Sequence, residues 1–157
     1  MNPLHDPALL RAVLEDYARQ TRFRGAPATW TYHREEILPH CGDRLSLYVT
    51  RDDTRCLYLA YEASGCLLSQ ASAAMMVDLL QHSTLYNARL RVSSILQMFT
   101  TGESDQTSLP PPLTYLMPML GLPTRRRCAT FPWNVAHALL QAIPDDSRTP
   151  DDNPHTP

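Results

Sequence analysis

The sequence predicts an α+β domain: an N-terminal helix, a small antiparallel sheet of about three strands, and then a C-terminal set of helices packed on that sheet. Two observations carry this prediction. Apolar residues alternate with a period of two between residues 45 and 61, which is typical of strands, and after residue 66 the period becomes helical. Strands that precede helices in this way indicate an α+β fold. We expect one domain over residues 1–143 and a disordered, proline-rich tail over residues 144–157.

The first helix is expected over residues 6–20. Asp6 can cap this helix, and Pro7 suits its first turn because proline needs no hydrogen-bond partner there. The apolar stripe of the helix consists of Leu10, Val13, Leu14 and Tyr17.

Strands are expected over residues 29–32, 45–50 and 55–61. In the second of these, alternation places Leu45, Leu47 and Val49 on one face. The polar run RDDT separates the last two strands and predicts that they form a hairpin.

Further helices are expected over residues 66–80, 84–101, 113–120 and 130–142. In the first of these, Leu68, Ala71, Met75 and Leu79 share one face. The second directs Leu85, Ala88, Val92, Ile95, Leu96 and Phe99 inward, and we expect Gly102 to end it. We place the start of the last helix no earlier than about Thr130, because Pro132 is tolerated only in a first helical turn.

The composition excludes several classes of protein. All fourteen basic residues are arginine, so the chain has neither a Walker-type phosphate loop nor a Schiff-base lysine. Its five dispersed glycines exclude a glycine-rich dinucleotide loop. A net charge of −2 gives no electrostatic reason to expect nucleic acid or an acidic membrane as partner, and there is no apolar run long enough to span a membrane.

The four cysteines are expected to be reduced thiols. The first twenty residues are amphipathic and acidic where a signal peptide needs an uninterrupted apolar stretch, so we expect a cytoplasmic protein. In that compartment, metal binding or catalysis explains cysteines better than disulfides do. Cys56 lies within a strand pattern and is interpreted as a buried, inert thiol.

The other three cysteines share a setting that favours the thiolate. Cys41 lies in a loop leading into a strand, Cys66 lies where a strand gives way to a helix, and Cys128 follows three arginines just before the expected last helix. With Asp43 they offer three sulfurs and one oxygen, a sufficient set for tetrahedral Zn²⁺. Their spacing matches no compact zinc finger or ribbon, and by itself it leaves open that these are unrelated structural cysteines.

The residues around the three cysteines resemble a known family. CGDRLSL from residue 41, YEASGCLLSQASAAMM around residue 66 and RRRCATFPW around residue 128 are similar, in order and spacing, to the cysteine signatures of the IscU/SufU superfamily of iron–sulfur assembly proteins. The likeness covers roughly residues 8–142 and implies the fold shared by SufE and NifU-like proteins. The chain departs from the family pattern at Leu38-Pro39-His40, where Asn-Pro is usual, and at Pro132, where alanine is usual.

Within the superfamily the chain resembles the SufU branch of zinc-dependent sulfurtransferases. The IscU branch typically has histidine directly before its third cysteine, and here that position is Arg127. The SufU branch has arginine three residues before that cysteine and an insertion after the second one. Arg125 and the 61 residues between Cys66 and Cys128 fit this description.

The resemblance implies that Cys41, Asp43, Cys66 and Cys128 hold Zn²⁺ and that Cys41 accepts sulfur from the persulfide of a SufS-like cysteine desulfurase, for delivery to a downstream iron–sulfur scaffold. Arg125 would stabilise the sulfur-bearing thiolate, or it is a solvated arginine of a basic run. His40 is an alternative ligand in place of Asp43. Two other functions stay open: an IscU-type scaffold with a [2Fe–2S] cluster on the same cysteines, and a purely structural zinc domain.

Overall fold

The computed structural model describes residues 5–39, 41–101 and 109–145. The elements, in chain order, are α1 (Pro7–Arg19), β1 (Tyr32–Leu38), β2 (Asp43–Arg51), β3 (Leu57–Ser64), α2 (Leu67–Leu80), α3 (Leu85–Thr101), the 3₁₀ helices η2 (Pro111–Tyr115) and η3 (Met117–Met119), and α4 (Pro123–Ala142). The three strands form one antiparallel sheet in the order β1-β2-β3. The predicted α+β architecture is therefore confirmed. None of the described helices is both long and apolar enough to cross a membrane.

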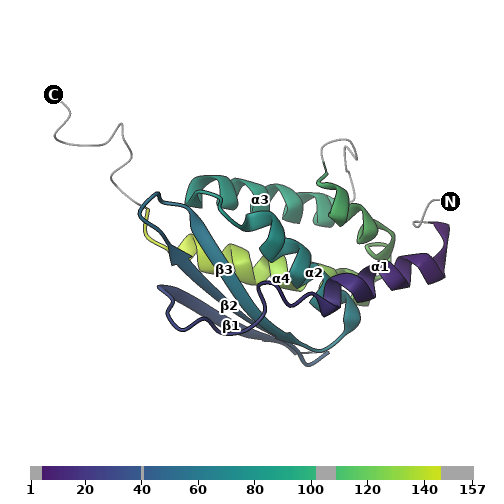
Figure 1. Ribbon diagram of the computed structural model, residues 1–157. Helices are drawn as coiled ribbons and strands as arrows, with labels where there is room; N and C mark the ends of the chain where they lie inside the picture. The colour runs from purple at the N-terminus through teal and green to yellow at the C-terminus, as the bar shows by residue number, and fades with distance from the viewer. Residues whose placement is uncertain (1–4, 40, 102–108, 146–157) are drawn as a thin grey trace.

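The helices form layers on one face of the sheet (Figure 1). α2 packs on β3, α4 packs on β1 and β2, and the two helices also contact each other. α3 packs on α4, farther from the sheet, and α1 packs on α2. The predicted apolar face of β2 lies against these helices, since Leu45, Leu47 and Val49 are all at most 1% exposed.

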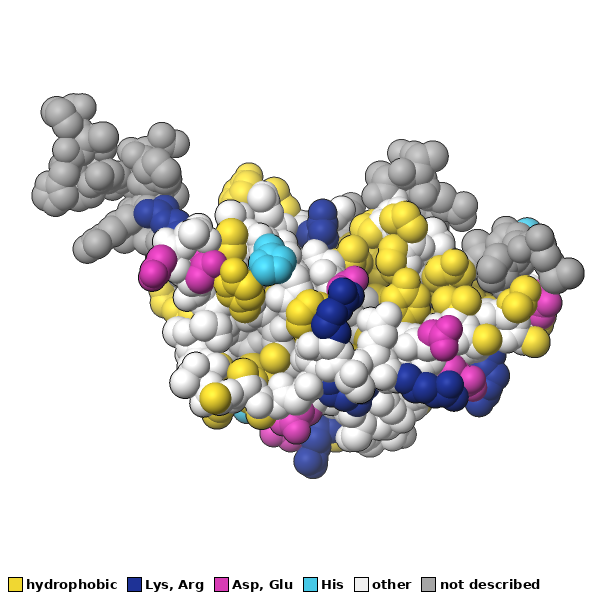
Figure 2. All heavy atoms as spheres, in the orientation of Figure 1, with side chains coloured by type: hydrophobic (Ala, Val, Ile, Leu, Met, Phe, Trp, Pro, Cys, Tyr) yellow, Lys and Arg dark blue, Asp and Glu magenta, His cyan; other side chains and the backbone are white. Residues whose placement is uncertain are grey.

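α1 is amphipathic, as its sequence pattern predicts. Asp6 caps it by accepting hydrogen bonds from the N–H groups of Ala8 and Leu9, and Leu10 and Leu14 are buried. Its exposed side carries ion pairs among Arg11, Glu15 and Arg19. Figure 2 shows charged side chains along one side of α1 and apolar side chains gathered over the other side and the adjoining 3₁₀ segments.

β1 corrects the first predicted strand. The expected segment was 29–32, whereas the strand runs from Tyr32 to Leu38. β1 pairs only with β2 and is mostly exposed, and its centre carries His33, Arg34, Glu35 and Glu36. An edge strand of this kind is held by backbone hydrogen bonds to one neighbouring strand and buries no complete face. Its sequence therefore lacks the alternation of apolar and polar residues by which strands are recognised.

α2 is buried on nearly every side rather than on one face. Ala73, Met76 and Val77 are buried as completely as the predicted Ala71 and Met75. The cause is its position, because the sheet, α1 and α4 all pack against it. The predicted Leu79 is only partly buried, and so is Leu96 in α3.

α4 begins at Pro123, well before the predicted Thr130, and Pro132 lies inside it. Pro132 has no N–H to donate to the carbonyl of Cys128, one helical turn earlier. A buried hydroxyl stabilises the helix next to this gap: Ser72 Oγ donates to the carbonyl of Ala129 (2.6 Å) and accepts from Trp133 Nε1 (3.1 Å). Contacts with α2 therefore override the local preference of proline.

Two further predictions concern the region before α4 and the chain end. The helix expected over 113–120 is replaced by η2 and η3, two short 3₁₀ segments in a proline-rich stretch. Gly102, the expected end of α3, lies outside the described residues, as does the predicted tail from residue 146 onward.

The two tryptophans of the chain provide a matched test of this packing. Trp133 is fully buried and Trp30 is 48% exposed. We expect Trp133→Ala to lower the free energy of unfolding by about 3–5 kcal/mol, because it removes a large core side chain and the hydrogen bond to Ser72. Trp30→Ala should cost less than about 1 kcal/mol. Urea unfolding followed by far-UV circular dichroism measures both, and equal losses would contradict this account of the core.

Candidate metal and sulfur site

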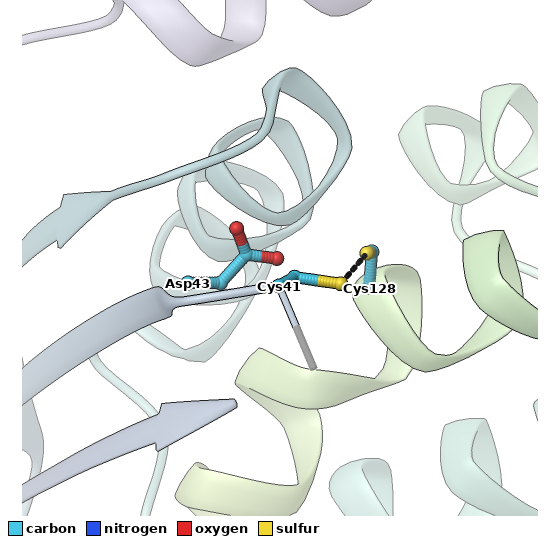
Figure 3. A group of neighbouring side chains, drawn as sticks. All are labelled: Cys41, Asp43 and Cys128. Atoms are coloured by element: carbon cyan, nitrogen blue, oxygen red, sulfur yellow. Dashed lines mark hydrogen bonds between the residues drawn. The ribbon is translucent and has the colours of Figure 1, made fainter. Parts of the chain in front are cut away.

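Three groups able to bind a metal converge at one end of the sheet (Figure 3). The Sγ atoms of Cys41 and Cys128 and a carboxylate oxygen of Asp43 all lie within 4.8 Å of one another. The two sulfurs are 3.7 Å apart. Cys41 lies in the turn between β1 and β2, Asp43 opens β2, and Cys128 comes from α4. The fold thus brings together residues from both ends of the domain.

Cys66 joins this group through Asp43. The backbone N–H of Cys66 donates to Asp43 Oδ1 (2.7 Å), and its thiol donates to Asp43 Oδ2 (3.3 Å). Cys66 is also the N-cap of α2, where its sulfur accepts a hydrogen bond from the N–H of Ser69 (3.4 Å). Asp43 is only 1% exposed, so its carboxyl group is buried between the hairpin and α2.

Two glycines give the site its backbone shape, for different reasons. Gly42 has φ +69° and open space around it, so it is needed for its left-handed conformation between Cys41 and Asp43. Gly65 has φ +118°, and a Cβ there would lie 2.1 Å from Asp43 Oδ1. The second glycine is therefore required by the close approach of the Asp43 side chain.

The three cysteines differ in their exposure to solvent. Cys41 is exposed, Cys66 is half-buried and Cys128 is buried. Burial raises the pKa of the Cys128 thiol far above its ordinary value, and the neighbouring Cys66, Cys41 and Asp43 raise it further. The prediction that Cys128 precedes a helix and is favoured as a thiolate by that setting is wrong, because Cys128 lies within α4. Without a metal its thiol keeps its proton at neutral pH.

The remaining candidates make their hydrogen bonds with residues outside this cluster. Arg125 is exposed in the first turn of α4, and its guanidinium donates to Met119 Sδ (3.6 Å). Cys56 is half-buried just before β3, and its N–H donates to Asp52 Oδ1 (2.9 Å). His40, the alternative ligand, lies outside the described residues.

An arginine and a glutamine support the Gly65-Cys66 turn, and sequence reasoning missed both. Arg24 donates to the carbonyls of Ala18 (2.9 Å) and Ala63 (3.1 Å), which joins the end of α1 to the end of β3. Gln70 accepts a bond from Arg24 (3.3 Å) and donates to the carbonyl of Gly65 (2.9 Å). Only the spacing of Gln70 from Gly65 within the second cysteine motif could have indicated this role.

The donor set fits a tetrahedral metal ion. Two thiolates bound to one zinc at about 2.3 Å lie about 3.8 Å apart. The Cys41 and Cys128 sulfurs are separated by 3.7 Å, a distance that suits this arrangement. The buried Asp43 carboxyl group lies beside these two sulfurs and offers an oxygen ligand to the same ion. Thiolates also hold the iron of iron–sulfur clusters, so the sulfur pair alone does not distinguish the two metals.

A three-stranded sheet covered by helices, with three cysteines and a buried aspartate at one end, defines a class of small α+β domains with a thiolate-rich candidate metal site. Residues 27–110 match the family model of the NifU-like N terminal domain, and the chain belongs to this family. The matched segment includes Cys41, Asp43 and Cys66. Cys128 lies beyond it and reaches the site through the packing of α4.

Individual relatives agree with this assignment. The chain is 26% identical over 128 residues to the iron–sulfur cluster assembly scaffold protein IscU of Thermotoga maritima, covering 82% of this chain and 89% of the relative. It is 30% identical over 133 residues to the zinc-dependent sulfurtransferase SufU of Bacillus subtilis, and this match covers 81% of this chain and 86% of the relative. A crystal structure of FiSufU, a SUF-system protein from Fervidobacterium islandicum, superposes with a TM-score of 0.72 at 25% identity. The match covers 82% of this chain and 93% of that protein. The resemblance to the IscU/SufU superfamily is thereby confirmed.

The contact between Gly65 and Asp43 generates a direct test. We expect Gly65→Ala to displace the Asp43 carboxylate and to lower the free energy of unfolding by about 1–3 kcal/mol from backbone strain alone. Gly121→Ala is the matched control, since nothing lies within 4 Å of a Cβ there and its φ is ordinary. Urea unfolding of the metal-free proteins and zinc content after reconstitution report the two effects. A Gly65→Ala protein with unchanged stability and zinc content would contradict the geometry described.

Proposed function

We propose that this protein is a zinc-dependent sulfur carrier of iron–sulfur cluster assembly. It accepts sulfur on Cys41 from the persulfide of a SufS-like cysteine desulfurase and passes it to a downstream assembly scaffold. The observation that carries the proposal is the asymmetry of the site. Cys41 is an exposed thiol on a glycine turn, and it lies 3.7 Å from the sulfur of buried Cys128 and next to buried Asp43.

The transfer step is a thiol exchange on Cys41. The Cys41 thiolate attacks the outer sulfur of the donor persulfide, a new S–S bond forms on Cys41, and the desulfurase thiolate leaves with the electron pair of the broken bond. The reacting thiol must be reachable by a partner protein, and Cys41 is the exposed member of the cysteine cluster. Zn²⁺, when bound, supplies the charge that keeps the ligand thiols deprotonated.

Rigid elements carry three of the proposed metal ligands, which are Asp43, Cys66 and Cys128. Asp43 begins the central strand, Cys66 caps α2, and Cys128 lies within α4. Cys41 instead belongs to a turn that reverses through Gly42. If these residues hold Zn²⁺, Cys41 would therefore be the ligand whose release costs the fold least, and the other three would hold the ion.

Arg125 is the proposed electrostatic partner of the sulfur-bearing Cys41. It precedes Cys128 by three residues in the same helix, so the two side chains emerge on neighbouring parts of the helix surface. Its guanidinium makes one contact among the described residues, with Met119, and that contact is weak enough to exchange for an anionic sulfur.

A scaffold that holds a [2Fe–2S] cluster on the same cysteines is the second candidate, because the Thermotoga maritima relative is named a scaffold protein. Identity does not separate the two, because a relative named a scaffold protein IscU and the relative named a zinc-dependent sulfurtransferase are each 30% identical to the chain. The observation that favours the carrier is a sequence position. Arg127 occupies the position directly before Cys128 where the scaffold branch typically has histidine. A purely structural zinc domain would need no exposed ligand such as Cys41.

The test is anaerobic incubation with a cysteine desulfurase and cysteine, followed by peptide mass analysis and metal quantification. We expect one added sulfur on Cys41 and one zinc per chain. Zinc without any sulfur on Cys41 would reject the carrier and favour the structural domain. Iron and acid-labile sulfide in place of zinc would favour the scaffold.

Cysteine variants separate the two roles within the site. Cys41→Ser should abolish sulfur acceptance yet retain the fold and binding to the desulfurase, because Cys41 lies on an exposed turn. Cys128→Ser should also lose zinc and stability, because it removes a buried ligand whose binding energy contributes to folding. Cys56→Ser is the matched control and should change neither property. Equal behaviour of the Cys41 and Cys128 variants in zinc content, sulfur uptake and melting temperature would contradict this division.

Arg125→Gln tests the proposed electrostatic role. We expect sulfur uptake by Cys41 to slow by roughly tenfold or more with zinc content unchanged, because a charged hydrogen bond to the sulfur anion is lost. Arg127→Gln, an exposed arginine two residues further along α4, is the matched control. Equal effects of the two substitutions on the single-turnover rate would show that only the overall charge matters.

A further inference from the structure

The sulfur atoms of Cys41 and Cys128 form a contact pair whose members differ in exposure. They are 3.7 Å apart, and Cys128 is 5% exposed whereas Cys41 is open to solvent. Cys66 has other hydrogen-bond partners, since its sulfur contacts the Asp43 carboxylate and Ser69. The thiol best placed to react with a group carried on Cys41 is therefore Cys128.

We propose that Cys128 is a resolving thiol that expels the sulfur carried by Cys41 as sulfide when the site holds no metal, and that engagement of Cys128 as a metal ligand prevents this loss. The proposal rests on the sulfur-carrier function proposed above and adds a second activity to the same site. It also gives the metal a specific purpose, which is to keep the persulfide on the carrier until a recipient takes it.

The step balances without an outside oxidant. Cys128 Sγ attacks the inner sulfur of the Cys41 persulfide, a Cys41–Cys128 disulfide bond forms, and the bond between the two persulfide sulfurs breaks. The metal-free Cys128 thiol is protonated before the reaction, so its proton passes to the departing outer sulfur as Cys128 Sγ attacks. The outer sulfur takes this proton together with the electron pair of the broken bond and leaves as hydrosulfide. The carried sulfur is thereby reduced and the Cys128 sulfur is oxidised, while the Cys41 sulfur exchanges one S–S bond for another and keeps its oxidation state.

The surroundings of the pair favour this internal reaction over attack by an external thiol. Cys128 is held within α4, where the carbonyl of the neighbouring Ala129 accepts a hydrogen bond from Ser72 Oγ, which itself accepts one from Trp133 Nε1. Cys41 lies on the Gly42 turn, which can supply the approach from contact distance to a disulfide bond of about 2 Å. Two groups that are already in contact react as if at high concentration.

The experiment uses the full chain, metal-free or zinc-loaded, and inorganic polysulfide as the sulfur source under anaerobic conditions. Polysulfide loads exposed thiols without a desulfurase, so the test does not depend on the partner. After rapid desalting without added thiol, three quantities are followed: released sulfide, intact mass, and cross-linked tryptic peptides. Cleavage after arginine places Cys41 in peptide 35–44, Cys128 in peptide 128–148, and both Cys56 and Cys66 in peptide 56–89.

In the metal-free protein we expect one sulfide released for each cross-link between peptides 35–44 and 128–148. In the zinc-loaded protein we expect the added sulfur to stay on Cys41 and no cross-link to form. Cys128→Ser should abolish both sulfide release and the cross-link, and Cys56→Ser should change neither. The peptide map of the wild-type chain identifies the reacting pair even if the Cys128 variant does not fold.

Three results would overturn the proposal: a stable persulfide on metal-free Cys41, a cross-link to peptide 56–89, or movement of the sulfur onto Cys128 without sulfide release. A metal-free sample without polysulfide must stay fully reduced, because a disulfide formed there would have another origin and would also overturn it. Failure of the carrier function itself is seen separately, as the absence of sulfur on Cys41 after incubation with a desulfurase and cysteine.

Discussion

The buried carboxylate of Asp43 is the interaction on which this end of the molecule depends. Asp43 opens the central strand, and its Oδ1 accepts the N–H of Cys66 at the point where β3 gives way to α2. The carboxylate occupies the space that a side chain at Gly65 would need. One residue thus fixes the hairpin against the first turn of α2 and sets the positions of two cysteines, Cys41 and Cys66, relative to each other.

The sequence predicts well those parts of the fold that are governed by local patterns. Alternation identifies Leu45, Leu47 and Val49 as the inner face of β2, and Asp6 identifies the start of α1, because burial and capping act within a few residues. Asp43 enters the candidate site for a similar reason, since it stands in a short motif with Cys41. Its ligand role stays a prediction, because proximity alone does not establish a bound metal.

Features set by distant contacts could not be predicted in this way. Pro132 suggests a late start for α4, yet Ser72 on α2 supports the helix beside the missing hydrogen bond. That error also misplaces Cys128, which is a buried helical residue with a raised pKa rather than an activated thiol at a helix start. The edge strand β1 and the Arg24 contacts behind Gly65 likewise depend on partners far away in the sequence.

The different exposures of Cys41 and Cys128 give the site two opposing tendencies. An exposed thiol on a turn can meet a partner's persulfide, and its 3.7 Å contact with the buried thiol behind it places whatever it carries against that thiol. A carrier built on this pair has to restrain the buried thiol during transfer. In the proposed carrier, engaging Cys128 as a ligand together with Asp43 and Cys66 would achieve this without restricting Cys41, because Asp43 lies in β2, Cys66 caps α2 and Cys128 lies in α4. On this view the metal site protects the carried sulfur as much as it activates the thiol that receives it.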